Sequence, residues 1–588
     1  MDMVNVKING ISVSVEAGST ILEAARVAGI EIPTLCYMKE INEIGACRIC
    51  VVEAAEMRGP SLGPARVVTA CVYPVTEGME VQTNTPKIIA ARKNTLEMLL
   101  SVHNRKCLSC VRSGNCEFQT LCNEYGIEDE TAFAGAMPES EIDDSAVHMV
   151  RDNSKCILCR RCVAVCKEQS VAVIGANDRG FDTHIGCIYD KKLNEVDCIS
   201  CGQCIVNCPT GALYEKDNLD EVYEAIADPS KYVVVQTAPA VRAGLGEEFG
   251  YEIGTDVEGK MVAALRRLGF DKVFDTNVAA DFTIMEESTE LIDRVVNGGK
   301  LPLITSCSPG WIKYCEYHYP EFIENLSSCK SPQNMFGALA KSWYAEKIGV
   351  DPKDMFVVSV MPCTAKKFEV KRPELSVNGV PDVDVSITTR ELARMIKRAG
   401  LKFTSLPDEK FDSPIGDGTG AAVIFGATGG VMEAALRTAY ETITKTTLDD
   451  VDFTAVRGTE PVKVTEIKVG DLNVKVGVAS GGKAAKELLE RVKAGEEFTF
   501  IEIMGCPGGC VNGGGQPIQP TSVHQTVDIK AKRASALYSN DKNCAIRKSH
   551  ENPLVKEVYE TYLGAPNSHK AHELLHTHYV DRSKDVIM

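Results

Sequence analysis

Apolar and polar residues alternate along the first 30 residues, on both sides of an Asn-Gly pair. The stretch VNVKINGISVSVEAGSTILEAARVAGI has the two-residue period of β-strands, and Asn9-Gly10 is a two-residue hairpin signal. Ser19 and Thr20 then offer hydroxyl oxygens that can cap a short helix. The pattern predicts a β-hairpin followed by a helix.

Past residue 220 the pattern changes to apolar runs of strand length that alternate with helical stretches. The segments are KYVVVQTAPAVRAGL, MVAALRRLGFDKVFDTN, DMFVVSVMPC and AAVIFGATGGVMEAALRTAY. Such alternation is typical of an α/β domain, here of about 300 residues.

The chain has 588 residues and a formal charge of −17. That length exceeds what one hydrophobic core supports, so we expect about three to five domains. No run of about 20 apolar residues and no export signal is visible, which favours a cytoplasmic protein outside the membrane. The negative charge argues against nucleic acid as a partner, because binding it requires Lys and Arg against phosphates. A redox carrier or another protein is the expected partner.

The chain contains 24 cysteines. In a long chain without an export signal, cysteines are better explained as metal ligands than as disulfides. Two runs read Cys-x2-Cys-x2-Cys-x3-Cys, the signature of bacterial ferredoxins with two clusters, in which each fourth Cys ligates the other cluster. Eight buried core thiols are the alternative. We therefore expect two [4Fe–4S] clusters, one held by Cys156, Cys159, Cys162 and Cys208 and the other by Cys198, Cys201, Cys204 and Cys166. Pro209 follows the second run as the pattern requires, whereas Lys167 replaces the proline after the first.

The N-terminal hairpin and helix resemble the β-grasp fold of plant-type ferredoxins. Four cysteines that follow can hold a [2Fe–2S] cluster: Cys36, Cys47, Cys50 and Cys71. The first gap is ten residues, where the plant-type pattern has four. The longer gap resembles the electron-input subunits of complex I and multi-cluster hydrogenases.

The segment HNRKCLSCVRSGNCEF carries His103, Cys107, Cys110 and Cys116. A zinc knuckle would use the same ligands. Between two iron–sulfur modules, however, the segment resembles the His-ligated [4Fe–4S] module of those families. Imidazole in place of a thiolate makes a cluster less negative and should raise its potential. We expect four clusters between residue 1 and about residue 215.

Three motifs in the α/β region, TSCSPGW, MPCTAKKFE and IEIMGCPGGCVNGGGQP, resemble the active-site signatures of [FeFe]-hydrogenases. The resemblance covers essentially the whole chain, and RASALYSNDKNCAIRKSHENP with AHELLHTHY resembles a fused small subunit. It implies a multidomain α+β and α/β protein with five parts. These are a β-grasp [2Fe–2S] domain (1–82), a [4Fe–4S] domain with one histidine and three cysteine ligands (83–140), a two-[4Fe–4S] ferredoxin domain (141–220), an H-cluster domain (221–525) and a small-subunit-like segment (526–588).

The resemblance further implies an H-cluster, a [4Fe–4S] cube joined through one cysteine to a two-iron unit with CO, cyanide and azadithiolate. The matching ligands are Cys363, Cys506 and Cys510, with Cys510 shared by both parts. Lys366 would donate to a cyanide, beside Glu369. Met361 and Met504 would line the wall over the iron, although core packing explains either methionine equally well.

The chain departs from the family motif Thr-Ser-Cys-Cys-Pro-x-Trp, because Ser308 occupies the place of the second cysteine, a cube ligand. Three solutions are open: Ser308 ligates, Cys307 ligates, or Cys329 in NLSSCKSPQ supplies a thiolate. Cys329 is favoured, since thiolate binds iron well and Cys307 would remain free as a proton relay. Simple packing of Cys329 is the competing explanation.

The resemblance gives a proton path of Cys307, Glu287, Ser327 and Glu290. Glu287 and Glu290 are three residues apart, which places them on one face of a helix. The expected activity is reversible conversion of protons and electrons to H2. Ferredoxin, or partner subunits that bind NAD(P) and flavin, would exchange the electrons, since no Gly-x-Gly-x-x-Gly fingerprint is present.

Two other classes of protein compete with this interpretation. Iron–sulfur assembly proteins share hydrogenase-like motifs without making H2, but they lack the long series of clusters. An electron-transfer subunit like those of complex I would leave residues 300–588 without a purpose.

Overall fold

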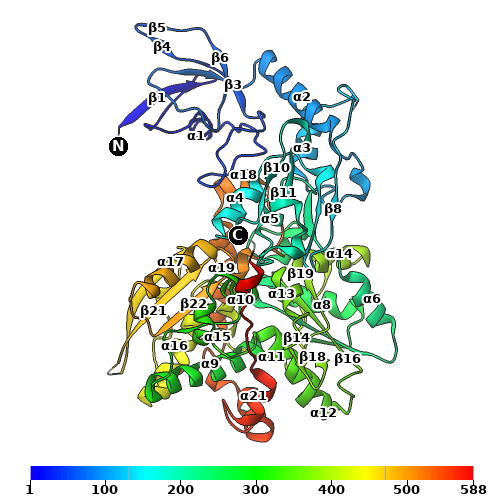
Figure 1. The fold of residues 1–588 in the computed structure, drawn as a ribbon, viewed down its shortest axis with the longest axis vertical. Coiled ribbons are helices and arrows are strands. Elements are labelled where there is room, and N and C mark those ends of the chain that lie inside the picture. The colour runs from blue at the N-terminus through cyan, green and yellow to red at the C-terminus, as the bar shows by residue number, and fades with distance from the viewer. Residues whose placement is uncertain (1, 130, 471, 587–588) are drawn as a thin grey trace.

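The computed structural model describes residues 2–129, 131–470 and 472–586. In Figure 1 the N-terminal sheet lies at one end of the long axis and the two lobes of the α/β region fill the other half, with the cysteine-rich helices α4 and α5 between them. The multidomain α+β and α/β organisation expected from the sequence is confirmed. No helix in the described ranges is both long and apolar enough to cross a membrane.

The N-terminal module is a five-stranded sheet packed on one helix. Its strand order is β2-β1-β7-β3-β6, with β1 (Met3–Ile8) and β2 (Ile11–Glu16) antiparallel and β7 (Glu80–Gln82) parallel to β1. The other strands are β3 (Val51–Ala55) and β6 (Arg66–Thr69). Asn9 and Gly10 turn the predicted hairpin with φ of 49° and 83°. Thr20 caps α1 (Ile21–Val27) in a capping box with Glu23, as the pattern predicted.

The second module is small and mostly helical. Thr85 caps α2 (Pro86–Ser101), and Pro86 occupies the first turn, where its missing N–H costs nothing. A short turn, η1 (Cys107–Ser109), precedes α3 (Glu117–Glu124). The sulfur of Cys116 caps α3 by accepting the Gln119 N–H at 3.5 Å.

The third module repeats one unit twice. α4 (Arg161–Glu168) and α5 (Gln203–Val206) begin at equivalent points of the two cysteine runs, after a residue with positive φ, 62° at Arg160 and 68° at Gly202. The helices are framed by a sheet of β12 (Leu213–Glu215), β9 (Met149–Asp152) and β8 (Ile142–Asp143) and by a hairpin of β10 (Ile174–Asn177) and β11 (His184–Cys187).

The α/β region contains two four-stranded sheets. The first has the order β14-β13-β16-β19, all parallel, from β14 (Lys272–Asp275), β13 (Tyr232–Thr237), β16 (Met355–Met361) and β19 (Val385–Thr388). The second sheet has the order β15-β22-β21-β20. In this sheet β20 is antiparallel to β21, and the other pairs are parallel. Its strands are β15 (Leu303–Ile304), β22 (Phe500–Met504), β21 (Leu472–Ser480) and β20 (Val462–Val469).

Helix α9 (Asn277–Asn297) lies between these two sheets. Val278 and Phe282 pack with α11 (Pro332–Leu339) on the first sheet, while Ile284 and Leu291 pack with α16 (Gly430–Thr444) on the second. α8 (Glu258–Leu268) and α14 (Thr389–Arg398) cover the outer face of the first sheet, and α10 (Pro309–His318) and α17 (Gly482–Lys493) that of the second. The parallel strands of both sheets direct their carboxyl ends to one central region, where ligands bind in such folds.

The C-terminal segment forms α18 (Thr521–Thr526), α19 (Ile529–Asn543), α20 (Pro553–Val558) and α21 (His569–Leu575). Figure 1 shows it running from the cysteine-rich helices along the lobes to α21 at the far end of the molecule, from which the chain returns to a C-terminus near the middle. Residues of α20 and α21 pack into the same core as α9 and α11. The segment is therefore integral to the fold of the α/β region.

Candidate functional site

The four cysteines of the N-terminal module are arranged in two pairs. The sulfur atoms of Cys50 and Cys71 are 3.3 Å apart, and the Cys36 and Cys47 thiols are hydrogen-bonded to each other. All four are buried. A [2Fe–2S] cluster places two thiolates on each iron, so the paired arrangement fits it.

His103 is buried in the second module, with its ring edge against Phe118 at 5.1 Å between centroids. Among the described residues its Nδ1 has no hydrogen-bond partner. Burial, together with the charge of Lys155, lowers the pKa of His103 to about 4. The imidazole is therefore neutral, as a metal ligand must be.

The two cysteine runs cross over in space. A small cavity is bounded by three thiols of the first run and by the last thiol of the second, and its lining includes Cys156, Cys159, Cys162 and Cys208. The complementary set consists of Cys166, Cys198, Cys201 and Cys204: burial raises the pKa of Cys204, and the charges of the other three thiols raise it further. Both groups therefore match the two sets of four donors that the sequence pattern assigns to cubes.

A thiol-lined cavity of the α/β region lies where the strands of both sheets end. Its walls come from the segments that follow β13, β14, β15, β16 and β22, and from helix-linking loops. Among the lining residues are Cys307, Ser308, Met361, Cys363, Lys366, Met504, Cys506 and Cys510, together with Phe425 and Gln333. All three of the sequence motifs meet here.

Lys366 is held at the cavity wall by a short network of hydrogen bonds. Its ammonium donates to the Glu369 carboxylate at 2.8 Å and to the Cys307 carbonyl oxygen at 3.3 Å. Ser331 and Gln333 donate to the same Glu369 oxygen, each at 2.9 Å. The Glu369 carboxylate is therefore held by three hydrogen bonds, and it fixes the positively charged Lys366 side chain at the cavity wall.

Three thiols are positioned to bind iron. Burial raises the pKa of Cys363 and Cys506, and raises that of Cys510 to about 12, so each is a neutral thiol until a metal cation compensates the charge. Ser308 is the further donor on the same wall, and its hydroxyl accepts the Gly505 N–H at 3.0 Å beside Cys506. A cube of four irons fits this set of donors.

Cys329 does not join this cavity, contrary to the preferred expectation from the sequence. Its thiol is buried with Glu290 and His576, whose ligand atoms lie within 4.8 Å of it and of each other. The backbone fixes this placement, since Ser306 donates to the Cys329 carbonyl at 2.8 Å and Cys329 forms a β-bridge with His576. Supplying a ligand to the cavity would therefore require this segment to leave the core.

The structure places Cys307, Glu287, Ser327 and Glu290, the four residues of the expected proton path, close to one another. Glu287 is buried, and desolvation with the nearby charge of Glu290 raises its pKa to about 8. The charge of Glu287 in turn raises the pKa of Cys307, after the effect of burial. Ser327 donates to Glu290 at 3.2 Å and also interacts with Glu287. Of these four side chains, only Cys307 lines the cavity, and Glu287 and Glu290 belong to the second half of α9.

The glycine run Gly513–Gly515 has a clear structural reason. A Cβ atom at Gly513 would lie 2.0 Å from the Pro362 carbonyl oxygen, and one at Gly515 would lie 2.8 Å from the Cys363 nitrogen. The loop therefore approaches the Cys363 backbone more closely than any other residue would allow.

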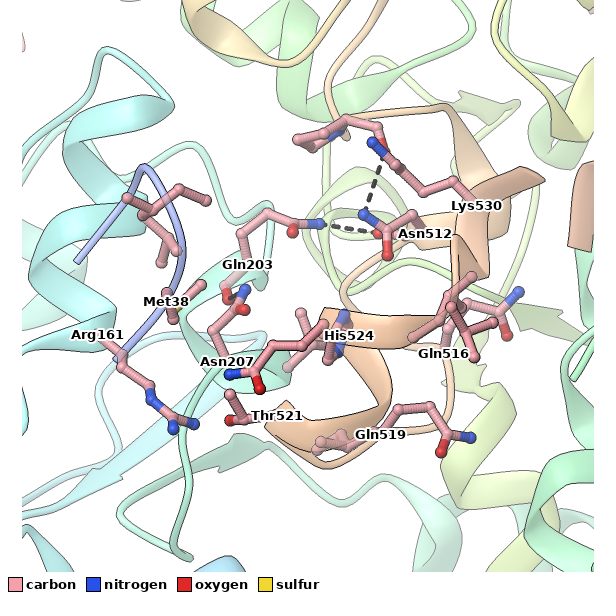
Figure 2. Close-up of a pocket in the computed structure, with 18 of the residues that line it drawn as sticks. Met38, Arg161, Gln203, Asn207, Asn512, Gln516, Gln519, Thr521, His524 and Lys530 are labelled. Atoms are coloured by element: carbon pink, nitrogen blue, oxygen red, sulfur yellow. Dashed lines mark hydrogen bonds between the residues drawn. The ribbon is translucent and has the colours of Figure 1, made fainter. Parts of the chain in front are cut away.

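A second cavity lies at the junction of the modules. Figure 2 shows Met38 from the first module, Arg161 and Gln203 from the third, and His524 and Lys530 from the C-terminal segment around it. In the part of the chain that the structure describes, no cysteine lines it. Its amide and charged side chains distinguish it from the thiol-lined cavity, which remains the candidate metal centre.

Five family models match successive parts of the chain. They are described as a 2Fe-2S iron-sulfur cluster binding domain (residues 1–86), an NADH-ubiquinone oxidoreductase-G iron-sulfur binding region (92–131), a 4Fe-4S dicluster domain (155–212), the iron only hydrogenase large subunit, C-terminal domain (231–514) and the iron hydrogenase small subunit (527–582).

Whole-chain relatives agree with these models. The chain is 50% identical to the NADP-reducing hydrogenase subunit HndD of Solidesulfovibrio fructosivorans, over 99% of this chain and 100% of the relative. It is 43% identical to iron hydrogenase 1 of Clostridium pasteurianum, over 98% of this chain and 100% of the relative. A variant of the apo [FeFe]-hydrogenase HydA1 of Chlamydomonas reinhardtii superimposes with a TM-score of 0.55 at 43% identity, covering 61% of this chain and 98% of that one.

The models, the relatives and the fold describe one architecture: an H-cluster domain preceded by [2Fe–2S] and [4Fe–4S] binding domains and followed by a fused small-subunit segment. The chain belongs to the iron-only, or [FeFe], hydrogenase family.

Proposed function

We propose that this hydrogenase converts protons and electrons reversibly into H2 in the thiol-lined cavity. The observation that carries the proposal is the position of Cys307, which lines the cavity on one side and interacts with the buried Glu287 on the other. A proton donor is thereby placed between the metal centre and an acidic group whose pKa is about 8.

Cys363, Cys506 and Cys510 would hold the H-cluster, which supplies the iron chemistry of H2 formation when bound. Because Cys329 lies outside the cavity, we assign the fourth donor position of the cube to Ser308. Lys366, fixed by Glu369, would donate to anionic ligands of the two-iron unit. Met361 and Met504 line the same cavity and help to exclude water.

Proton delivery would follow Glu290, Ser327, Glu287 and Cys307. A carboxyl group with a pKa near the operating pH can both accept and release a proton, and Glu287 meets this condition. The Ser327 hydroxyl both donates and accepts, so it can link the two carboxyl groups.

Electrons would enter through the cysteine-rich modules. Cys116 of the second module lies 3.6 Å from the carbonyl of Pro209, directly after Cys208, and Cys36 packs in one buried group with Cys159. Both outer modules therefore adjoin the same cube of the third module. Its second cube adjoins the cavity: burial raises the pKa of Cys506, and the charges of Cys363 on the cavity wall and of Cys201 in the second cube raise it further.

The second candidate, an iron–sulfur assembly or electron-transfer protein, explains less. It gives no role to a proton path that ends at a thiol on the cavity wall. Infrared spectra of the anaerobically purified, cluster-loaded chain distinguish the two. Bands of iron-bound CO and cyanide, with H2 uptake on addition of an oxidised dye, are expected. An iron-loaded chain without either would reject the proposal.

Two observations support partner proteins that bind the nicotinamide: the name of a relative, and the absence of a nucleotide-binding role for the glycines of this chain's GATGG segment. The relative at 50% identity is named an NADP-reducing hydrogenase subunit, which supports partner subunits that bind nicotinamide and flavin. The glycines of the GATGG segment in this chain serve packing instead. A Cβ atom would lie 1.9 Å from the Val456 oxygen at Gly429 and 1.8 Å from the Ile424 oxygen at Gly430.

The second module offers a docking surface for a small acidic carrier such as ferredoxin. Leu108, between Cys107 and Cys110, is fully exposed, and Lys106 beside it is an exposed cation on a chain of net charge −17. Such a surface favours an acidic partner by charge and by apolar contact. We place the protein in the cytoplasm, where such carriers and reduced thiols occur.

Two variants test the docking surface. Leu108→Glu and Lys106→Glu should slow turnover with an acidic ferredoxin, while turnover with methyl viologen, which needs no docking surface, stays at the wild-type rate. Equal ferredoxin-linked rates in both variants and the wild type would contradict this placement.

A further inference from the structure

The second cube of the third module has a buried imidazole beside one of its thiols. This cube is the one nearer the cavity, and Cys198 is one of its four ligands. His148 Nε2 lies 3.8 Å from the Cys198 sulfur, and only 3% of the His148 surface is exposed. The His148 carbonyl accepts the Lys216 N–H at 3.1 Å, which fixes the backbone at this point. A metal-bound thiolate only accepts hydrogen bonds, so the ring nitrogen that faces it carries a proton and donates to the sulfur.

A positive charge from the α/β region acts on the same thiol. Lys313 belongs to α10, and this helix packs on the third module, because Trp311 shares a buried core with Ile199, the residue after Cys198. Burial raises the pKa of the Cys198 thiol, whereas the charge of Lys313 lowers it. The charge of Asp197 raises this pKa, but by less than Lys313 lowers it. The charged side chains around Cys198 therefore have a net positive influence on it.

No carboxylate neutralises Lys313 by direct contact within the described ranges. Its ammonium lies over the face of the Phe368 ring, 4.2 Å from the centroid, where the ring attracts a cation. Glu316, one turn further along α10, is bound instead by Arg372 and Arg582. The charge of Lys313 is therefore not cancelled by a partner, and it remains available to the thiolate of Cys198.

The first cube of the module has a different electrostatic environment. The charges of two buried arginines, Arg151 and Arg161, act on its thiols. Arg151 forms a salt bridge with Asp143 at 3.2 Å, and Arg161 forms one with Glu117 at 2.8 Å. Opposite charges in contact largely cancel each other's field at a distance, so these pairs influence the first cube less than an unpaired cation would. Of the two cubes, the second has the more positive surroundings.

We propose that His148 and Lys313 raise the reduction potential of the second cube, so that an electron arriving from the outer modules is held next to the cavity. The inference rests on the proposed function. An added electron makes a cube more negative, and both a hydrogen bond to a ligand sulfur and a nearby positive charge stabilise the reduced form. In the transfer, the first cube loses one electron and the second gains it, and no bond is made or broken. His148 and Lys313 act through Cys198, so they are positioning residues.

The test is a redox titration of the iron–sulfur-loaded chain without the two-iron unit, followed by electron paramagnetic resonance. His148→Phe keeps a ring but removes the N–H, and Lys313→Met keeps the aliphatic stem but removes the charge. Both substitutions should move the same one-electron step to a more negative potential. The expected change in the reduction equilibrium is about tenfold, which corresponds to about 59 mV.

Two further variants separate this effect from a structural one. His148→Gln, whose amide can still donate to the sulfur, should titrate close to the wild type. His184→Phe is the matched control in the same module, because the His184 ring is hydrogen-bonded to the Asp182 carbonyl and to Asp190. It should leave every step of the titration at the wild-type potential.

Three results would overturn the proposal. The first is a titration at wild-type potentials in both His148→Phe and Lys313→Met, and the second is a shift of different steps by the two substitutions. The third is loss of cluster iron in both variants, because the residues would then hold the cluster in place without setting its potential. Failure of the proposed function is distinguishable, since the titration needs no two-iron unit, whereas that failure appears as a loaded wild-type chain without CO bands or H2 turnover.

Discussion

Gly514 packs so closely against Cys201 that a Cβ atom on the glycine would lie 2.3 Å from the Cys201 carbonyl oxygen. Gly514 belongs to the loop after Cys510, and Cys201 belongs to the nearer cysteine group of the third module. This contact joins the electron-carrying part of the chain to the catalytic cavity. Thr364 strengthens the junction by donating to the Ser200 carbonyl at 2.8 Å.

Gly514→Ala is predicted to loosen this junction. The methyl group meets backbone atoms that cannot rotate away, so a destabilisation of about 1–3 kcal/mol is expected, as in other overpacked cores. Ferredoxin-driven H2 evolution should fall more than hydrogen–deuterium exchange, which needs no electrons from the third module.

Gly175→Ala is the control for this substitution. Gly175 lies in the third module, and its Cβ would meet nothing within 4 Å. It should retain both activities and the thermal stability of the wild type. Equal behaviour of the two alanine variants would show that the close approach has no role in electron transfer.

A second prediction concerns the fourth donor of the cube. Cys329→Ala should retain the wild-type iron content, because its thiol lies with Glu290 and His576 and not on the cavity wall. Ser308→Ala should lose cube iron, since it removes both a donor and the acceptor of the Gly505 N–H. Ser308→Cys should keep full iron.

Iron analysis and electron paramagnetic resonance of the three variants check this assignment. Cys307→Ala serves as the matched control on the neighbouring residue: it should keep the cube while losing turnover, since its thiol interacts with Glu287. Loss of iron in Cys329→Ala would contradict the assignment to Ser308 and would identify Cys329, the residue favoured by the sequence, as the fourth ligand of the cube.

Features of this molecule that depend on residues close together in the chain could be predicted from the sequence. The hairpin at Asn9-Gly10 and the cap at Thr20 are set by neighbouring residues, and both are confirmed. Each of the three active-site motifs has a characteristic spacing of residues and lies at the end of a strand. Each motif could therefore be recognised in the sequence independently of the other two.

Features that depend on contacts between distant segments could not be derived in this way. The position of Cys329 is fixed by a β-bridge to His576, which lies in the small-subunit-like segment almost 250 residues further along the chain. The need for glycine at position 514 also could not be predicted, because it arises from the contact with Cys201 of the third module.

A third prediction follows from the raised pKa of Glu287, about 8 compared with 4.5 for an ordinary glutamate. Between these two values the folded protein holds a proton that the unfolded chain has released. Stability from this group is therefore present at low pH and is lost as pH rises toward 8, by about 1.4 kcal/mol per pH unit.

Glu287→Gln removes this contribution. Thermal unfolding of the cluster-loaded wild type and of the variant should diverge, with the wild type losing stability relative to Glu287→Gln between about pH 5 and pH 8. Glu573→Gln, at an exposed position of α21, should follow the wild type throughout. Parallel curves for wild type and Glu287→Gln would mean that Glu287 is ionised in the folded protein.

The final prediction tests the metal bound by the second module. His103 is neutral and has an unpartnered Nδ1 among the described residues, so it can ligate either a [4Fe–4S] cube or zinc. In His103→Cys a thiolate adds negative charge to an iron–sulfur cube, and its reduction potential should become more negative while iron content is retained. Cys122→Ser, a change in the neighbouring helix α3, should leave the potential unchanged. A redox titration followed by electron paramagnetic resonance measures the shift. Zinc in place of iron, with no redox signal from this module, would establish the zinc knuckle and remove one cluster from the electron path.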